Sequence, residues 1–160
     1  MIKNYDRQKA VEYAREWALG ANPKFYHFGG IGGDCTNFIS QCLLAGGGIM
    51  NYDYVNGWYY ISVDNRSPSW TSVAYLQKYL LRESGVGPFA KIRNIQDLEI
   101  GDLIQLRQNP THFNHTLIIT RKVGSDIYVC AHSNDALDKA LSSYSYVQSL
   151  GLHIEGIRTT

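Results

Sequence analysis

The sequence predicts an α+β fold in which N-terminal helices pack on a C-terminal antiparallel sheet. Apolar residues at helical spacing occupy the first half of the chain, and short runs of strand character occupy the second half. Helices that precede the strands, instead of alternating with them, favour an antiparallel sheet. The length of 160 residues fits one domain, so we expect residues 1–160 to form a single unit.

The N-terminal part of the chain is predicted to contain two helices separated by a loop. The first covers residues 6–19, with Asp6 as its N-cap and Gly20 at its end. The glycine-rich stretch 20–34 is predicted to be a loop. The second helix begins at or near Cys35 and ends at three consecutive glycines, Gly46, Gly47 and Gly48.

The remaining elements follow an aromatic, irregular stretch over residues 49–67. A third helix is predicted from a Ser69 cap to about Leu81. Its inward face carries Trp70, Val73, Leu76 and Leu80. Beyond the break at residues 85–88 the pattern changes to strand-like runs at 102–107, 115–123, 127–132 and 152–158.

Composition and charge exclude several classes of protein. The chain has 15 Lys and Arg against 14 Asp and Glu, a formal net charge of +1, so no general affinity for nucleic acid or acidic membranes is expected. No segment approaches the roughly 20 apolar residues of a transmembrane helix. The first residues lack the apolar region of a signal peptide, so no export signal is expected in this chain. Nothing in the sequence predicts an oligomeric state.

The cysteines indicate a free thiol. Three cysteines are too few for a disulfide framework, and an odd number leaves at least one unpaired. Cys35 and Cys42 lie seven residues apart in a predicted helix, roughly 10 Å along its axis, which is beyond the reach of a disulfide. Cys42 and Cys130 fall on apolar faces and are predicted to be structural.

Cys35 is the candidate nucleophile because it follows a glycine-rich loop and begins a helix. Unpaired backbone N–H groups and the positive end of the helix dipole are expected to lower the pKa of its thiol. The same N–H groups can stabilise an oxyanion beside the sulfur. The alternative is that Cys35 is a small buried residue like most free cysteines.

A nucleophilic cysteine needs a general base, and His115 is the best placed of the five histidines because a predicted strand begins there. If a hairpin turns at Gly124 and Ser125 with Val123 facing Asp126, His115 stands opposite Asn134 and His132 is its diagonal neighbour. A one-residue change in the turn brings Asp135 opposite instead. The residue that orients the base is therefore left open among His132, Asn134 and Asp135. His27, His112 and His153 are predicted to be structural.

Several motifs resemble known cell-wall hydrolases. Tyr26–Gly30 followed by Asp34–Thr36, then Asp97–Ile104, then Asn114–Ile119, is similar to the signature of the NlpC/P60 and CHAP superfamily of bacterial peptidases. A closer resemblance is to the branch called the "putative amidase domain" family. Its pattern is met by Tyr5–Arg7, Gly32–Cys42, Gly57–Tyr60, Ser67–Trp70 and His132–Asp135.

The resemblance implies a papain-like α+β fold and a cysteine-dependent amide or peptide hydrolase that acts on peptidoglycan stems or related amides. It implies Cys35 as nucleophile, His115 as base and His132 as the orienting residue, with Asn134 able to take that last role. It also implies an extracellular or cell-envelope location and no cofactor. Thr36 and Asn37 depart from the Ser-Gly that follows the nucleophile in many NlpC/P60 members.

Residues around the nucleophile are expected to complete the site. The resemblance implies that Tyr26 and the Cys35 backbone N–H lie near the oxyanion, and Asp34 and Trp58 are expected near the oxyanion or the substrate.

Two other readings compete with the hydrolase. A non-catalytic module could bind glycan or peptide through an aromatic platform of Trp58, Tyr59, Tyr60 and Trp70. Trp70 falls on the inward face of the predicted third helix and is therefore predicted to be a core residue. A zinc site could use Cys35, His115 and His132, with His112 as a further ligand, but no paired-cysteine motif supports it.

Overall fold

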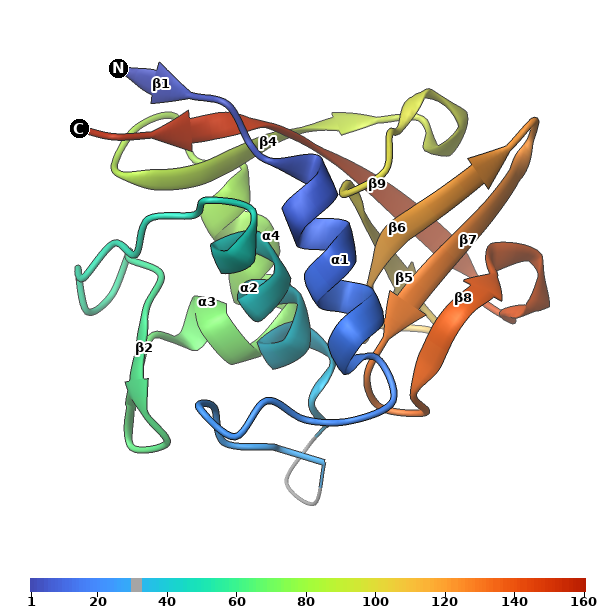
Figure 1. Cartoon of the computed structure of the whole chain (residues 1–160), viewed down its shortest axis with the longest axis horizontal. Helices are drawn as coiled ribbons and strands as arrows, with labels where there is room; N and C mark the ends of the chain where they lie inside the picture. Colours follow the sequence, from blue (N-terminus) through green and yellow to red (C-terminus); the bar gives the residue numbers. More distant parts are fainter. Residues whose placement is uncertain (30–32) are drawn as a thin grey trace.

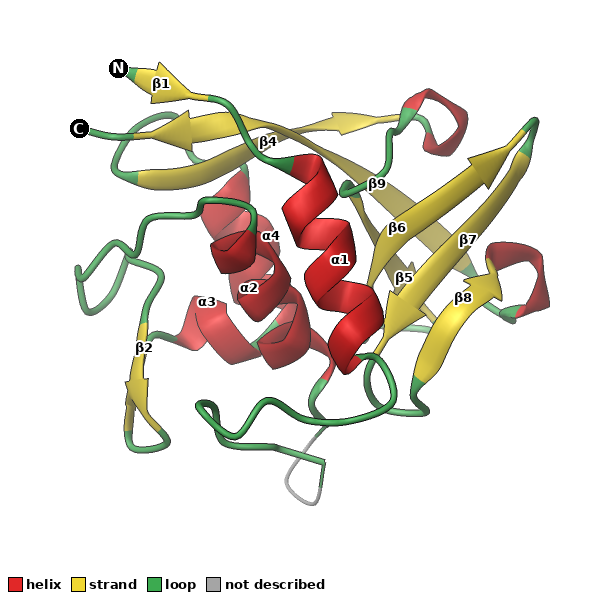
Figure 2. Ribbon diagram, in the orientation of Figure 1, coloured by secondary structure: helices red, strands yellow, loops and turns green. Residues whose placement is uncertain are grey.

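Helices pack against one face of an antiparallel sheet (Figures 1 and 2). The computed structural model describes residues 1–29 and 33–160, so Gly30 and Gly32 of the predicted glycine-rich loop lie outside the described residues. The predicted α+β class with an antiparallel sheet is confirmed. None of the helices in the described ranges combines the length and apolar character needed to cross a bilayer.

The first two helices begin where the sequence predicts. Helix α1 (Arg7–Trp17) has Asp6 as its N-cap, whose side chain accepts a hydrogen bond from the Lys9 N–H. Helix α2 (Cys35–Ala45) begins at Cys35 and ends at Gly46, whose N–H bonds back to the helix. Helix α2 is buried along most of its length because α1, α3 and the sheet cover it. The candidate nucleophile is therefore held by the central helix of the fold.

The predicted third helix is two helices. Helix α3 (Pro68–Thr71) and helix α4 (Val73–Leu80) are separated by Ser72, whose backbone is extended at φ −108° and ψ 129°. The Ser72 side chain accepts a hydrogen bond from the Tyr75 N–H and so caps α4. A serine inside an apolar pattern here begins a new helix instead of continuing the old one.

The sheet has seven strands in the order β1-β9-β5-β6-β7-β8, and β4 also pairs with β9. Every pairing is antiparallel. Its strands are β1 (Ile2–Lys3), β4 (Gly87–Arg93), β5 (Leu103–Arg107), β6 (His115–Val123), β7 (Asp126–Ala131), β8 (Ala136–Ala140) and β9 (Gln148–Arg158). A separate hairpin joins β2 (Tyr60–Ser62) to β3 (Asn65–Arg66). Two 3₁₀ turns, η1 (Ile95–Asp97) and η2 (Leu141–Ser143), flank the sheet.

Strands β1, β2, β3, β4 and β8 were not predicted, because each is short, lies at an edge, or carries turn residues. Strand β4 contains Gly87 and Pro88, which read as a break in the sequence. Among the described residues β4 pairs only with β9, so it is an edge strand, where proline is tolerated.

The predicted β6–β7 register is right near the turn and wrong at the other end. Val123 faces Asp126 as predicted, but the register shifts between Ile119 and Arg121, so Ile118 pairs with Cys130. The bulge at this point moves the partners of the preceding β6 residues, Ile118 and Ile119, by one position. The predicted pairing of His115 with Asn134 therefore does not form. Strand β7 ends at Ala131, and Ser133 and Asn134 both have positive φ.

The sheet separates two apolar cores. The larger core lies between the helices and the sheet and is centred on residues such as Phe38, Leu43, Trp70 and Ile118. The smaller core covers the opposite face of β5, β6 and β7 and includes Ile104, Leu117 and Val129. Strand β6 therefore has residues on both faces buried, which holds its first residue rigidly.

Candidate active site

Cys35 and His115 line the same cavity, of about 370 Å³. Cys35 is the first residue of α2 and His115 the first residue of β6, so rigid elements position both side chains. Asn134 lines the cavity as well. The other lining residues are Gly33, Gln108, Asn114, Ser133, Lys139, Ser143, Tyr144 and Ser145. The fold thus brings together three of the four sequence-predicted catalytic residues.

The environment of the Cys35 thiol differs from the prediction. Burial raises the pKa of Cys35, and this effect outweighs the hydrogen bonds from the Thr116 backbone and from Thr36 that favour the thiolate. The Sγ atom lies 3.7 Å from Thr36 Oγ1 and makes no hydrogen bond with His115. The predicted lowering of the thiol pKa is therefore wrong, because desolvation exceeds the hydrogen bonds that favour the thiolate.

His115 is held in its neutral form at neutral pH. Burial, and to a smaller extent the positive charge of Lys139, lower the pKa of its imidazole to about 4. A neutral imidazole can accept a proton, which a general base must do. A thiol with a raised pKa and a neutral histidine therefore line the same cavity.

The low pKa of His115 predicts acid sensitivity. The unfolded chain takes up a proton near pH 6.5 that the folded chain takes up only near pH 4, so stability falls as pH decreases through this range. Between pH about 7.5 and about 4.5, wild type is expected to lose about 2–3 kcal/mol more than His115→Gln. Urea unfolding of both proteins at the two pH values measures the difference. Equal losses in the two proteins would contradict the assignment.

His132 forms a buried ion pair with Asp34 and does not contact His115. Its Nδ1 lies 2.5 Å from Asp34 Oδ2, and its Nε2 lies 2.7 Å from the Trp17 carbonyl oxygen. A carbonyl oxygen and a carboxylate only accept hydrogen bonds, so both ring nitrogens donate and the imidazole is a cation. The ring also stacks on Phe38 at a centroid distance of 4.0 Å.

The pKa values of this pair agree with that charge state. Burial acts to lower the pKa of His132, but the hydrogen bonds to Asp34 and to the Trp17 carbonyl raise it overall. Burial acts to raise the pKa of Asp34, but the hydrogen bonds from His132, the Phe28 N–H and Asn37 lower it overall. Each partner therefore favours the charged form of the other.

Asp34 ties together the three segments that surround the nucleophile. Its Oδ1 accepts hydrogen bonds from the Phe28 N–H and from Asn37 Nδ2. Its backbone N–H donates to Ser133 Oγ at 2.8 Å. Gly33, with φ of 96°, leaves room for that serine, since a Cβ there would lie 3.1 Å from Ser133 Oγ. Asp34 thus holds the segments around Phe28 and Ser133 against the start of α2, and it does not line the cavity.

Of the other two residues expected near the oxyanion or substrate, neither lines this cavity. Tyr26 is 41% exposed, and its ring packs edge-on against Phe28. Trp58 is fully buried and donates a hydrogen bond from Nε1 to Ser40 Oγ. Its predicted contact with substrate is wrong in this conformation because the side chain belongs to the core.

The four residues of the predicted aromatic platform do not form an exposed surface, since three are buried and Tyr60 is half-buried. Trp58, Tyr59 and Trp70 are buried, and Trp70 donates a hydrogen bond to Asn37 Oδ1. The prediction that Trp70 is a core residue is confirmed. Trp58 and Trp70 belong to the larger core and bond to Ser40 and Asn37 of α2, whereas Tyr52 and Tyr54 are exposed.

The metal reading loses its geometric basis. Among the described residues, the groups whose ligand atoms converge are His27 with Asp34 and His132, and Glu99 with Asp102 and His153. Neither group contains Cys35 or His115. In the first group, His132 Nδ1 donates its proton to Asp34, so this nitrogen is not available to a metal ion. In the second group, the Arg7 guanidinium lies 2.7 Å from Asp102 and occupies that carboxylate.

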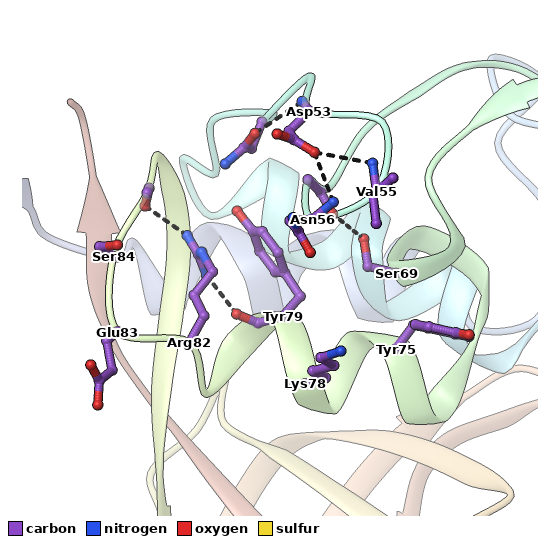
Figure 3. A pocket seen from close by; sticks show the side chains of 13 residues that line it. Asp53, Val55, Asn56, Ser69, Tyr75, Lys78, Tyr79, Arg82, Glu83 and Ser84 are labelled. Carbon is purple, nitrogen blue, oxygen red and sulfur yellow. Dashed lines mark hydrogen bonds between the residues drawn. The ribbon is translucent and has the colours of Figure 1, made fainter.

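A second cavity, of about 410 Å³, lies between α4 and the 51–57 loop and shares no lining residue with the first (Figure 3). Arg82 crosses it, and its guanidinium donates to the carbonyls of Tyr79, Gly85, Val86 and Pro88. Ser69 donates to the Gly57 carbonyl. Since these polar groups are used to hold the loops, this cavity has no reactive pair comparable to Cys35 and His115.

Lys139 and Tyr144 were missed by the sequence analysis. Both line the cavity of Cys35, but Lys139 lies on β8 and Tyr144 follows η2, elements that were not predicted. No local pattern marks either residue.

Comparison with known proteins gives a family model and two relatives. The model described as "Putative amidase domain" matches residues 4–154. "Uncharacterized protein YhbB" of Bacillus subtilis (strain 168) is 38% identical over 122 residues, covering 74% of this chain and 38% of that protein. "Uncharacterized protein YjcM" of the same organism is 27% identical over 149 residues, covering 86% of this chain and 33% of that protein. The chain thus spans about a third of the length of these relatives. No solved structure matches.

Proposed function

The chain belongs to the "Putative amidase domain" family, and from that premise we propose that it is a cysteine-dependent amide hydrolase. The observation that carries the proposal is that Cys35 and His115 line one cavity. Each of them is the first residue of a rigid element, α2 or β6. A nucleophile beside a neutral histidine is the arrangement that acyl transfer from an amide requires.

The proposed reaction has two stages. His115 accepts the proton of the Cys35 thiol as the sulfur bonds to the carbonyl carbon of the amide. The C–N bond then breaks while the His115 imidazolium gives its proton to the leaving amine, and a thioester remains on Cys35. Water, activated by His115, hydrolyses that thioester and restores the thiol. The free backbone N–H groups of the first turn of α2 are the donors available to the oxyanion.

The residue that assists His115 is proposed to be Asn134. Asn134 lines the cavity with His115, whereas both ring nitrogens of His132 are bonded to Asp34 and Trp17. His132 is therefore proposed to act through Asp34, as a positioning residue for the segment before Cys35. Asp135 is exposed and does not line the cavity.

The proposed substrates are peptide stems of peptidoglycan or related amides. Support comes from the family and from the motifs shared with cell-wall peptidases. The polar amides and hydroxyls that surround Cys35 suit a substrate with a peptide-like backbone.

The test compares wild type with Cys35→Ala on purified peptidoglycan and a panel of peptides. Mass spectrometry detects newly released amines. Wild type is expected to release them and Cys35→Ala to release none, while His115→Gln is expected to be slower by about 100-fold or more. Cys42→Ala, on the same helix but in the core, is the matched control and is expected to keep activity. Identical product profiles from wild type and Cys35→Ala would overturn the proposal.

A further inference from the structure

Lys139 introduces a positive charge into the cavity of Cys35 and His115. Among the described residues that line the cavity, Lys139 alone has a formal charge at neutral pH. None of the ion pairs formed by the described residues includes Lys139. An exposed ammonium group with no acidic partner, beside a nucleophile, is available to a ligand.

The position of Lys139 is fixed on the histidine side of the cavity. Its Nζ lies 4.3 Å from the centre of the Tyr144 ring, and that ring lies 6.2 Å from the His115 ring. The cation–π contact holds the flexible lysine side chain near the cavity wall. The Tyr144 hydroxyl is buried and has no hydrogen-bond partner among the described residues, so this wall has an unused polar group as well as an unused charge.

We propose that Lys139 binds a carboxylate on the amine portion of the amide substrate. A single ammonium group matches the single charge of a carboxylate. Because His115 gives its proton to the leaving amine, a charge on the histidine side of the cavity faces that part of the substrate. This inference rests on the proposed function, and it narrows the substrate class to amides whose leaving amine carries an acidic group, as an amino acid does.

Binding of a carboxylate also assists His115. The charge of Lys139 contributes to the low pKa of His115, second to burial. A carboxylate beside Lys139 offsets part of the effect of its positive charge on His115. The pKa of His115 therefore rises, and the base becomes stronger, when the correct substrate is present. A neutral amide in the same position leaves the effect of that charge in place.

Alkylation of Cys35 tests the charge without any assumption about substrate. Iodoacetate and iodoacetamide react with the same thiolate, but only iodoacetate carries a carboxylate. The ratio of their second-order rate constants at Cys35, followed by peptide mass mapping, therefore cancels changes in the pKa of the thiol. Lys139→Met is expected to lower the iodoacetate-to-iodoacetamide ratio by about 3–10-fold, because an opposite charge at the cavity is removed.

Three further variants make the result specific. Lys139→Arg is expected to keep the wild-type ratio, and Lys139→Glu to lower it below that of Lys139→Met. Lys78→Met is the matched control, since Lys78 is an exposed lysine at the other cavity (Figure 3), and its ratio is expected to equal that of wild type. Raising the salt concentration is expected to lower the iodoacetate-to-iodoacetamide ratio of wild type only slightly, because the charge of Lys139 acts on the reagent over a short distance. An unchanged ratio in Lys139→Met would overturn the proposal.

Turnover provides the second arm. Peptides that differ only in a free or an amidated C-terminal carboxylate are compared as substrates. Wild type is expected to prefer the free carboxylate in kcat/KM, and Lys139→Met is expected to lose that preference. Equal kcat/KM for the two peptides in wild type would overturn the carboxylate assignment. Absence of turnover in wild type, with the alkylation ratio still dependent on Lys139, would instead count against the hydrolase and leave the anion site in place.

Discussion

Asp34→Ala is expected to lower the free energy of unfolding by about 3–5 kcal/mol, because it removes one partner of a buried ion pair. The variant leaves the His132 cation without its carboxylate. It also leaves the Phe28 N–H without its acceptor and Asn37 Nδ2 with the Tyr26 carbonyl alone. Asp34 is 1% exposed and His132 2% exposed, so water does not replace the lost contacts. Chemical denaturation measures the loss.

Asp34→Asn separates the charge from the hydrogen bonds. The amide oxygen can still accept from Phe28 and Asn37, while its NH₂ faces His132 and forces that ring to become neutral. The variant is expected to lose less stability than Asp34→Ala. NMR of the ring nitrogens should report a cation in wild type and a neutral ring in Asp34→Asn at pH about 7.

The pH dependence follows from the same pair. The folded pKa of His132 is raised, so its stabilisation is complete below the unfolded value near pH 6.5 and is lost as pH rises through the folded pKa. The folded pKa of Asp34 is lowered, so its stabilisation is present above the unfolded value near pH 3.9 and is lost as pH falls through the folded pKa. A decline of wild-type stability above neutral pH that is absent from Asp34→Asn is the expected signature.

Asp64→Ala, at an exposed aspartate, is the control and should change stability by less than about 0.5 kcal/mol. Parallel pH curves in wild type and Asp34→Asn would contradict the ion pair.

Asp102→Ala is expected to cost a similar amount, about 3–5 kcal/mol, at the opposite end of α1. Asp102 is fully buried and bonds to Arg7 at 2.7 Å and to His153 Nδ1 at 2.7 Å. It also accepts from the Glu99 and Ile154 N–H groups. The variant leaves two backbone donors and His153 Nδ1 without this acceptor. It also removes the carboxylate from the Arg7 guanidinium, which keeps its bonds to the Ile100 and Ile154 carbonyls.

The measurement is again denaturant unfolding, with Asp97→Ala as the matched control. Asp97 lies in the same sequence motif but is exposed, so its replacement should change stability by less than about 0.5 kcal/mol. Because Asp102 is remote from the Cys35 cavity, the alkylation rate of Cys35 in the folded Asp102→Ala protein should match that of wild type. A stability loss below about 1 kcal/mol would show that the ion pair with Arg7 contributes little.

These contacts explain motifs that the sequence analysis could only record. Tyr5 donates a hydrogen bond to the Gly101 carbonyl, and Arg7 bonds to Ile100 and Asp102. The Tyr5–Arg7 motif and the Asp97–Ile104 motif are thus two halves of one structural cluster. The Gly57–Tyr60 and Ser67–Trp70 motifs meet in the same way, since Ser67 donates to the Tyr59 carbonyl and Ser69 to that of Gly57.

Local patterns were sufficient for the elements that begin the site. The Asp6 cap, the start of α2 at Cys35 and the limits of β6 at His115 and Val123 depend on neighbouring residues, and the structure agrees with all of them. The split at Ser72 and the β6 bulge were not predicted, because each depends on which hydrogen bonds the surrounding fold offers.

The sequence by itself identified the two residues that we propose as nucleophile and base: a cysteine that begins a helix, and a histidine that begins a buried strand. The tertiary structure decided the state and the neighbours of those residues. Burial, which has no local signature, raises the pKa of Cys35 and lowers that of His115 to about 4. Long-range pairing directs His132 to Asp34 and brings Lys139 of β8 to the cavity wall. Desolvation and contacts between distant segments exist only once the chain has folded, so the charge of the cavity could not be read from the sequence.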